Sequence, residues 1–267
     1  MTKRIGGNME SNTKIIFFDI DGTLIDMKRK QISGKTMEML IRLKEKGVMI
    51  CIATGRAPSA LPAFGDIVFD VYLTFNGSYC YNRDQIIFSN PLLTDDVDTI
   101  IKNAETIHRP LSLATKDRQA ANGKDDDLVE YYGFANREVE VADDFEKVAK
   151  EEVYQIMLGC RERDHLSLLN GVHRAKIAAW WDRAVDIIPA DGGKGIGIEK
   201  VLEYYHLNQS EAMAFGDGNN DIEMFQAVGK GIAMANASDR LKEAAYGLCG
   251  DAAEDGIYHY CLEHGLI

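Results

Sequence analysis

The chain has 267 residues, 46% of them hydrophobic, and a formal net charge of −12. This length allows one large or two small domains with a sizeable core, and the acidic balance argues against a nucleic-acid partner held through phosphate contacts. No apolar stretch approaches the length of a membrane span, and the N-terminus lacks the apolar segment of a secretory signal. We therefore expect neither a nucleic-acid nor a membrane partner.

The cysteines are odd in number, widely spaced and without a Cys-x-x-Cys pair. This pattern argues against a disulfide framework and against structural zinc. A reducing cytoplasm is the simplest setting for such a chain. We expect each cysteine to serve as a small buried apolar residue.

The first part of the chain alternates apolar runs with amphipathic segments. Ser33 is expected to cap a helix over residues 35–46, and Pro58 fits the first turn of another helix. The apolar runs are typical of strands buried on both faces, and they span residues 15–18, 48–53 and 70–75. This alternation predicts an α/β fold with a doubly wound parallel, Rossmann-like sheet.

The pattern changes near residue 82 and returns after residue 189. Between these points strands and helices lack the regular buried-strand rhythm, so we interpret residues 82–189 as an inserted α+β domain. Residues 1–81 and 190–267 then form one core domain that the insert splits. Hinges are expected near residues 76–81 and 189–193, which are rich in turn-forming types.

Three strands of the predicted core end in polar clusters. Each cluster alone is compatible with an ordinary polar turn. In open α/β sheets, however, the active crevice lies beyond the carboxyl ends of the strands, so three such clusters are expected to converge there. The clusters are Asp19 with Asp21, Thr54 with Gly55 and Arg56, and Asp217 with Asn220 and Asp221.

Two kinds of chemistry are possible at this crevice. Asp19 and Asp217 offer hard oxygen ligands at adjacent strand ends, which suit Mg²⁺, and the clusters contain no His or Cys for zinc. Thr54 and Gly55 offer a hydroxyl and a backbone N–H to an anion. Lys194 adds a positive charge from a glycine-rich stretch, and Asn220 adds an amide donor. These groups match the needs of a phosphoryl group in transfer.

Four motifs follow one another in a fixed order, and their residues are Asp19–Thr23, Thr54–Arg56, Lys194 and Gly216–Asp221. Together with an insert of this size, the motifs resemble those of the haloacid dehalogenase superfamily of phosphatases, specifically Cof-type subclass IIB. The resemblance covers the chain from Lys14 onward. It implies a catalytic core, a cap formed by the insert, and the magnesium-dependent hydrolysis of small phosphorylated metabolites, with sugar phosphates first.

The resemblance also assigns roles to the clusters. Asp19 would attack phosphorus and form an aspartyl-phosphate, and Asp21 would act as general acid and then as general base. Magnesium would lie between the carboxylates of Asp19 and Asp217 and the backbone carbonyl of Asp21. The residues that would hold the phosphoryl oxygens are Thr54, Gly55, Lys194 and Asn220.

Less direct roles are implied for residues nearby. Asp221 would orient Lys194 or a metal-bound water, and Arg56 would either support its loop through a buried ion pair or contact the substrate. Trp180, Trp181 and Asp186 precede the return hinge, where they would suit a sugar unless the two Trp residues pack the cap sheet. Two other functions stay open, a phosphomutase and a non-catalytic module that binds a phosphometabolite.

Overall fold

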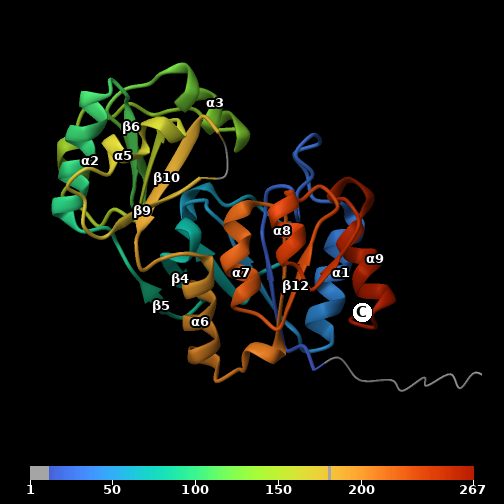
Figure 1. Ribbon diagram of the computed structural model, residues 1–267. Coiled ribbons are helices and arrows are strands. Elements are labelled where there is room, and N and C mark those ends of the chain that lie inside the picture. The colour runs from blue at the N-terminus through green and yellow to red at the C-terminus, as the bar shows by residue number, and fades with distance from the viewer. Residues whose placement is uncertain (1–11, 180–181) are drawn as a thin grey trace, which may run out of the picture.

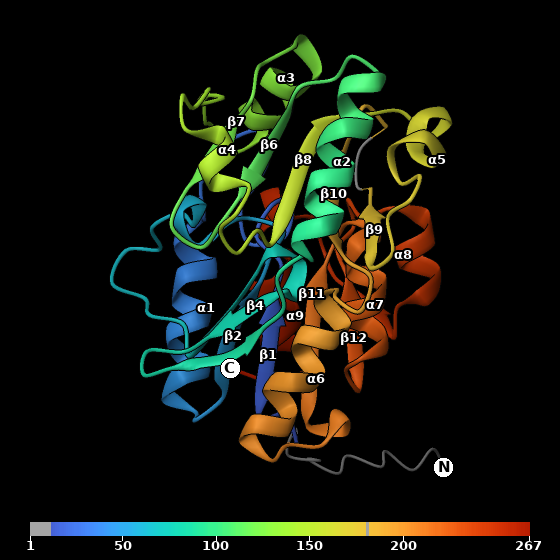
Figure 2. The ribbon, with the colours of Figure 1, turned by 90° about the vertical axis from the view of Figure 1, so that its left-hand side faces the viewer.

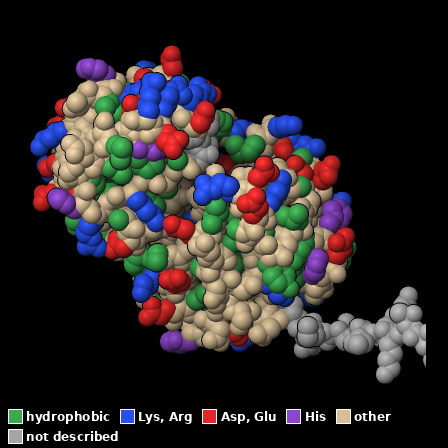
Figure 3. Space-filling model, in the orientation of Figure 1, with side chains coloured by type: hydrophobic (Ala, Val, Ile, Leu, Met, Phe, Trp, Pro, Cys, Tyr) green, Lys and Arg blue, Asp and Glu red, His purple; other side chains and the backbone are tan. Residues whose placement is uncertain are grey.

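The computed structural model describes residues 12–179 and 182–267. These residues form two parts, each built on its own β-sheet (Figure 1). Lys and Arg side chains lie among Asp and Glu side chains over both parts on the face shown in Figure 3. Among the helices of these two ranges, none combines the length and the apolar character needed to cross a bilayer.

The larger sheet has β1 near its centre, with the chain winding outward on both sides (Figures 1 and 2). Neighbours from β13 to β3 pair in parallel, and β4 and β5 join antiparallel. In sheet order the strands are β13 (Gly247–Leu248), β12 (Lys230–Ala233), β11 (Ala212–Gly216), β1 (Ile15–Phe18), β2 (Met49–Ala53), β3 (Val71–Thr74), β4 (Tyr79–Tyr81) and β5 (Ile86–Ser89). The strand order reverses next to β1, which is where ligands bind in such sheets.

Helices cover both faces of this sheet, as the predicted doubly wound fold requires. Helix α1 (Gly34–Glu45) contacts α9 (Gly256–Glu263) on one face. Helix α7 (Ile222–Gln226) contacts both α6 (Lys194–Tyr205) and α8 (Asp239–Ala244) on the other (Figure 1). Short 3₁₀ turns lie between the strands and helices of this part, and they are η1 (Pro58–Ala60), η2 (Phe75–Gly77), η4 (Gln209–Glu211), η5 (Asn219–Asp221) and η6 (Ala252–Glu254).

The smaller sheet is antiparallel throughout. In sheet order its strands are β7 (Gln119–Ala121), β6 (Leu111–Ala114), β8 (Gln155–Gly159), β10 (Ala184–Pro189) and β9 (Ala175–Ala178). Its helices are α2 (Thr94–Thr106), α3 (Asp126–Phe134), α4 (Phe145–Val148) and α5 (His165–Leu168), with η3 (Glu162–Asp164) before the last. Helix α3 packs on β8 and β10, on the side that faces the larger part (Figure 1).

Alternation along the strands of the smaller sheet separates two surfaces. Ile156 and Leu158 of β8 join one apolar core with α2, whereas Met157 joins a second cluster that includes Phe75 and Tyr79 of the larger part. Side chains of a strand alternate between its faces, so the intervening residues point toward the larger part. The inserted sheet therefore rests on the core domain by one face and buries its own core on the other.

The α/β fold with an inserted α+β part is confirmed, and one strand differs from the prediction. Residues 86–89 were placed in the insert, but β5 pairs with β4 in the larger sheet. The Asn82 side chain accepts hydrogen bonds from the N–H groups of Asp84 and Gln85, which closes the turn between these strands. The remaining domain boundaries stay predictions. All five cysteines are free thiols, and four of them are buried.

Candidate active site

Neighbouring strand ends bring the predicted clusters to one edge of the larger sheet. Phe18, the last residue of β1, is in register with Phe215 of β11 and with Ile52 of β2. Parallel strands that are in register end at the same level. Asp19 therefore emerges between the loop that carries Asp217 and the loop that carries Thr54.

A buried lysine links two of these loops. Lys194 opens α6, and its Nζ lies 2.6 Å from Asp19 Oδ1 and 2.6 Å from Asp221 Oδ1. Its side chain is fully buried. Burial alone would lower the pKa of Lys194, but the two carboxylates outweigh it and raise the pKa, so the ammonium keeps its charge. The other oxygen of Asp221 accepts hydrogen bonds from the N–H groups of Asp217 and Gly218.

Three carboxylates lie close enough together to share one metal ion. Ligand atoms of Asp19, Asp217 and Asp221 all lie within 4.8 Å of one another. Burial, followed by the charges of Asp19 and Asp221, raises the pKa of Asp217 to about 8. A hard divalent cation would relieve this repulsion, and an all-oxygen donor set suits Mg²⁺. Asp19 and Asp217 therefore fit the predicted metal, whereas the oxygens of Asp221 already bond to Lys194 and to two backbone N–H groups.

The backbone at residue 22, beside the three carboxylates, leaves room only for glycine. Gly22 has φ +86°, and a Cβ there would lie 2.2 Å from Asp217 Oδ2. Thr23 Oγ1 donates to Asp217 Oδ1 at 3.2 Å, and Asn236 Nδ2 donates to Asp217 Oδ2 at 3.3 Å. The Asp-Gly-Thr sequence thus lets the first loop approach Asp217 closely and orients its carboxylate.

The Asp21 side chain forms an ion pair with Arg56. Arg56 Nε lies 2.8 Å from Asp21 Oδ2, and Arg56 Nη2 lies 2.7 Å from Asp21 Oδ1. Arg56 Nη1 also donates to the carbonyl of Ala60 in η1, at 3.0 Å. Of the two roles expected for Arg56, the structure contains the ion pair, in the bidentate geometry that guanidinium and carboxylate favour.

Beside the residues expected to hold phosphate lies one residue that the sequence analysis did not select. Asn220 Nδ2 donates to Asn76 Oδ1 at 3.1 Å, and the Asn76 amide also lies against Gly55. Asn76 was expected only as part of a hinge. Its left-handed backbone, with φ 52° and ψ 38°, is a conformation that Asn tolerates better than most residues. An Asn-Gly pair directly after a buried strand was the available signal.

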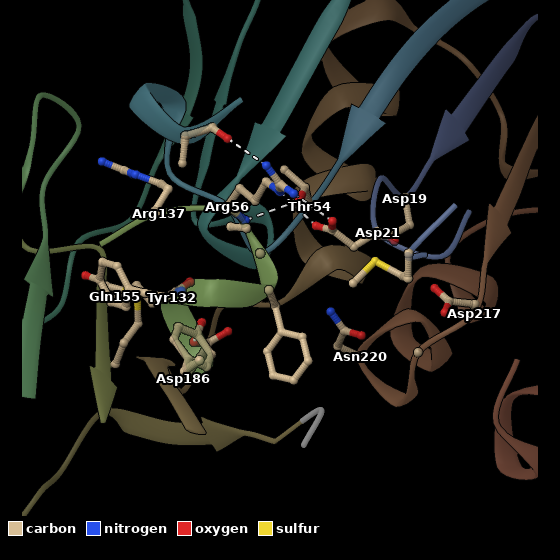
Figure 4. A pocket seen from close by; sticks show the side chains of 18 of the residues that line it. Asp19, Asp21, Thr54, Arg56, Tyr132, Arg137, Gln155, Asp186, Asp217 and Asn220 are labelled. Carbon is tan, nitrogen blue, oxygen red and sulfur yellow. Dashed lines mark hydrogen bonds and ion pairs between the residues drawn. The ribbon is translucent and has the colours of Figure 1, made fainter. Parts of the chain in front are cut away.

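A cavity of about 390 Å³ lies between the two parts of the chain (Figure 4). Its core wall includes the strand-end clusters, and its cap wall comes from β7, β8, β10, α3 and the residues just after α3. The lining residues on the cap side are Gln119, Tyr131, Tyr132, Phe134, Ala135, Arg137, Gln155, Met157 and Asp186. Of the predicted site residues, Lys194 and Asp221 do not line the cavity itself. Trp180 and Trp181 lie outside the described residues.

Asp186 reaches this cavity from the cap. It lies on β10 between Val185 and Ile187, which join the core of the smaller sheet, so its side chain takes the opposite face. Tyr131 donates to Asp186 Oδ1 at 2.6 Å, and Asn76 donates to Asp186 Oδ2 at 3.1 Å. Burial raises the pKa of Asp186 to about 7.

Comparison with known proteins agrees with this arrangement. The family model for haloacid dehalogenase-like hydrolases matches residues 16–261. The chain belongs to this family. YkrA of Bacillus subtilis is 31% identical to this haloacid dehalogenase-like hydrolase over 258 residues, 96% of this chain and 99% of YkrA.

Two further relatives of this hydrolase are named as phosphatases. The 5-amino-6-(5-phospho-D-ribitylamino)uracil phosphatase YitU of Bacillus subtilis is 28% identical over 271 residues, which cover 96% of this chain and 99% of YitU. The structure of the subclass IIB sugar phosphatase BT4131 matches with a TM-score of 0.86 at 28% identity, over 96% of this chain and 100% of that one. The protein is thus a phosphatase that acts on phosphate monoesters, and the resemblance seen in the sequence is confirmed.

Proposed function

We propose that this phosphatase is magnesium-dependent and hydrolyses small phosphate monoesters, with sugar phosphates as the leading candidate substrates. The reaction proceeds through an aspartyl-phosphate on Asp19. One observation carries the proposal. The fully buried Lys194 ammonium lies 2.6 Å from Asp19, beside a group of three carboxylates. Such a site binds a cation and an anion side by side, as phosphoryl transfer requires.

The metal would be held by Asp19, Asp217 and the backbone carbonyl of Asp21, with Asp221 within reach. When bound, Mg²⁺ supplies positive charge that offsets the acidic site and the charge of the phosphoryl oxygens. Asp19 is shielded from bulk water, because its side chain is only 9% exposed. Its carboxylate must be ionised to attack. Burial raises the pKa of Asp19 to about 7, whereas the Lys194 charge favours the ionised form.

In the first half of the reaction, a carboxylate oxygen of Asp19 forms a bond to phosphorus as the bond from phosphorus to the leaving oxygen breaks. Asp21 gives its proton to that oxygen, which leaves as an alcohol. Thr54, Gly55 and Asn220 would hold the phosphoryl oxygens, and Lys194 would supply positive charge near them.

In the second half, Asp21 takes a proton from water while the water oxygen bonds to phosphorus. The bond between phosphorus and Asp19 breaks, which restores the Asp19 carboxylate and frees inorganic phosphate. Arg56 keeps the Asp21 carboxylate at the wall of the cavity, within reach of the leaving group.

The cavity supports a small substrate with polar groups. Its volume of about 390 Å³ lies within the range of small-molecule sites. Gln119, Gln155 and Arg137 on the cap side offer hydrogen-bonding groups for hydroxyls. One relative is a sugar phosphatase, and another is named for a phosphate ester of a ribityl chain. The five free cysteines support a reducing cytoplasm as the setting.

The test is phosphate release from a panel of sugar phosphates and other small esters, with magnesium and with chelator. Asp19→Asn should lower the rate by roughly 10³-fold or more, because the nucleophile is lost. Asp66→Asn, at an exposed position outside the cavity, is the matched control and should retain the rate. Isomerised product without free phosphate would instead indicate a mutase, and tight binding without turnover would indicate a binding module.

A further inference from the structure

Asn76 lies at the interface between the core and the cap. It belongs to η2, directly after β3, and only 2% of its surface is exposed. Its amide contacts the Gly55 backbone closely enough that a Cβ on Gly55 would lie 3.2 Å from it. The side chain therefore lies between a predicted phosphate-binding loop and the cap sheet.

The three hydrogen bonds of Asn76 determine which way its amide faces. The amide nitrogen donates to Asp186 Oδ2 at 3.1 Å and to Gln155 Oε1 at 3.3 Å. The amide oxygen accepts from Asn220 Nδ2 at 3.1 Å. Two acceptors of the cap, Asp186 Oδ2 and Gln155 Oε1, both lie on the nitrogen side of the Asn76 amide, which leaves its oxygen for Asn220.

Hydrogen bonds within the protein use both carboxylate oxygens of Asp186. Its two carboxylate oxygens accept from Tyr131 and from Asn76, and 2% of its surface is exposed. Asp186 was expected to contact a sugar leaving group. Its partners in the structure indicate a different use, which is to set the direction of the hydrogen bonds that run from the cap to the core.

We propose that Asn76 is a positioning residue that transmits the orientation set by Asp186 and Gln155 in the cap to the amide of Asn220. This inference rests on the proposed function, in which Asn220 holds a phosphoryl oxygen. One N–H of the Asn220 amide is bonded to Asn76, which leaves the other N–H as the donor for a phosphoryl oxygen in the cavity that Asn220 lines. Figure 4 shows Asn220 between Asp186 and Asp217 in this view.

A coupling between the cap and the chemistry follows from this arrangement. Asp186 and Gln155 belong to the cap sheet, whereas Asn76 and Asn220 belong to the core. The Asn220 amide is therefore fixed by this network only when the cap rests on the core. Closure would exclude water and complete the phosphoryl site in the same step.

The first variant to test is Asn76→Gly. Glycine adopts the left-handed backbone of residue 76 without strain, so the change removes the amide and leaves the turn. Loss of the orienting bonds should lower kcat by roughly 100-fold, the effect of a small misplacement at a reacting centre. KM should change much less, because the contact matters most as charge shifts onto the phosphoryl oxygens.

A double-mutant cycle distinguishes positioning from a general structural role. If Asn76 acts through Asn220, then Asn76→Gly should lower kcat by less than about threefold when Asn220 is already Ala. Independent effects would multiply, and that result would overturn the proposal. Asp186→Ala removes the same orienting acceptor from the cap side and is used in the cycle if Asn76→Gly does not fold.

Two further variants complete the experiment. Asn82→Gly is the matched control, since Asn82 also makes three side-chain hydrogen bonds but lies outside the cavity. Its kcat should stay within about twofold of wild type, as for surface changes away from a site. Asp186→Asn should retain most activity. The oxygen of the new amide can still accept from Asn76, and its nitrogen can donate to the Tyr131 hydroxyl.

The outcomes separate the two proposals. Wild-type protein that releases no phosphate from any ester would refute the proposed function and this inference with it. Wild-type turnover with an unchanged kcat in Asn76→Gly would refute the positioning role alone. An increase of KM in Asp186→Asn without a change of kcat would show that Asp186 binds the leaving group directly.

Discussion

At the bottom of the active site, Lys194 is a buried cation held between Asp19 and Asp221. Removing water from three charged groups is costly, and their mutual attraction offsets that cost only while all three are present. The same ammonium that neutralises the carboxylates is the one proposed to supply positive charge near a phosphoryl group. Stability and chemistry therefore depend on the same side chain.

Replacement of Lys194 by Met should destabilise the protein by about 3–5 kcal/mol, because it leaves buried carboxylates without their cation. The loss should be smaller at pH 5 than at pH 8 in metal-free protein, since protonated carboxyls need no counter-charge. Urea unfolding at both pH values measures it. Lys200→Met, on the same helix but in an exposed pair with Glu203, should cost only about 0–1 kcal/mol.

The comparison of the two lysine variants can also contradict the prediction. If the two lysine variants lose equal stability at pH 8, the buried ion pairs contribute nothing beyond a surface pair. Local sequence alone was a weak signal for Lys194, which was selected because it stands in a fixed order with three other motifs along the chain. Local sequence was not sufficient to select Asn76, whose partners come from distant parts of the chain.

At the scale of single elements, helix α1 begins at a residue chosen from its sequence pattern. The Ser33 side chain accepts a hydrogen bond from the Thr36 N–H at 3.0 Å, which satisfies one of the unpaired donors at the helix start. This helix connects β1 to β2, the two strands that carry Asp19 and Thr54 at their ends. Its boundaries were predicted to within one residue because capping and periodicity are local properties.

Ser33→Ala should lower the free energy of unfolding by about 1 kcal/mol, the usual cost of losing an N-cap. Chemical denaturation with equal slopes for both proteins would measure the difference. Ser33→Asp should restore the stability, since a carboxylate oxygen caps a helix as well as a hydroxyl does. An Ala variant as stable as wild type would mean that the Thr36 N–H is equally well satisfied without the cap.

Strand β5 shows where reasoning about a single element fails. Its sequence, Ile-Ile-Phe-Ser, follows a change in pattern, and on that basis it was placed in the insert. The structure pairs it with β4 at the edge of the larger sheet. A short strand of this kind gives no local sign of which sheet it joins, since its partner and the turn at Asn82 decide that.

At the scale of the whole molecule, the cap lies over the carboxyl ends of the core strands and closes a cavity above them (Figure 1). The core side of this cavity carries buried carboxylates, and without a metal these carboxylates repel one another. Because the pKa of Asp217 is raised above its unfolded value, the folded protein binds more protons than the unfolded chain between those values. Metal-free protein should therefore lose stability as the pH rises toward 8.

Magnesium should reverse this effect. At a concentration about 100 times its Kd, a ligand specific to the folded state adds about 2.7 kcal/mol, which corresponds to an increase in Tm of roughly 5–10 °C. At a fixed magnesium concentration the increase should be larger at pH 8 than at pH 6, because the metal competes with protons for the carboxylates. Thermal unfolding with magnesium or chelator measures it.

Asp217→Asn is the control for the metal response. The amide removes a charged ligand and much of the repulsion, so the variant should show little response to magnesium and a weaker loss of stability with pH. A pH-independent increase in Tm that survives in this variant would place the metal elsewhere.

The sequence alone was enough to predict the family, the wound sheet and the strand-end clusters that meet at the cavity, because buried strands, caps and strand-end motifs are short-range patterns. Tertiary structure decided the partners of Asp21, which turns to Arg56, and the contact of Asn76 with Gln155 and Asp186. Asn76 is 79 and 110 residues away from its two cap partners in the chain. No local pattern encodes such a contact, because it depends on which face of the cap sheet rests on the core.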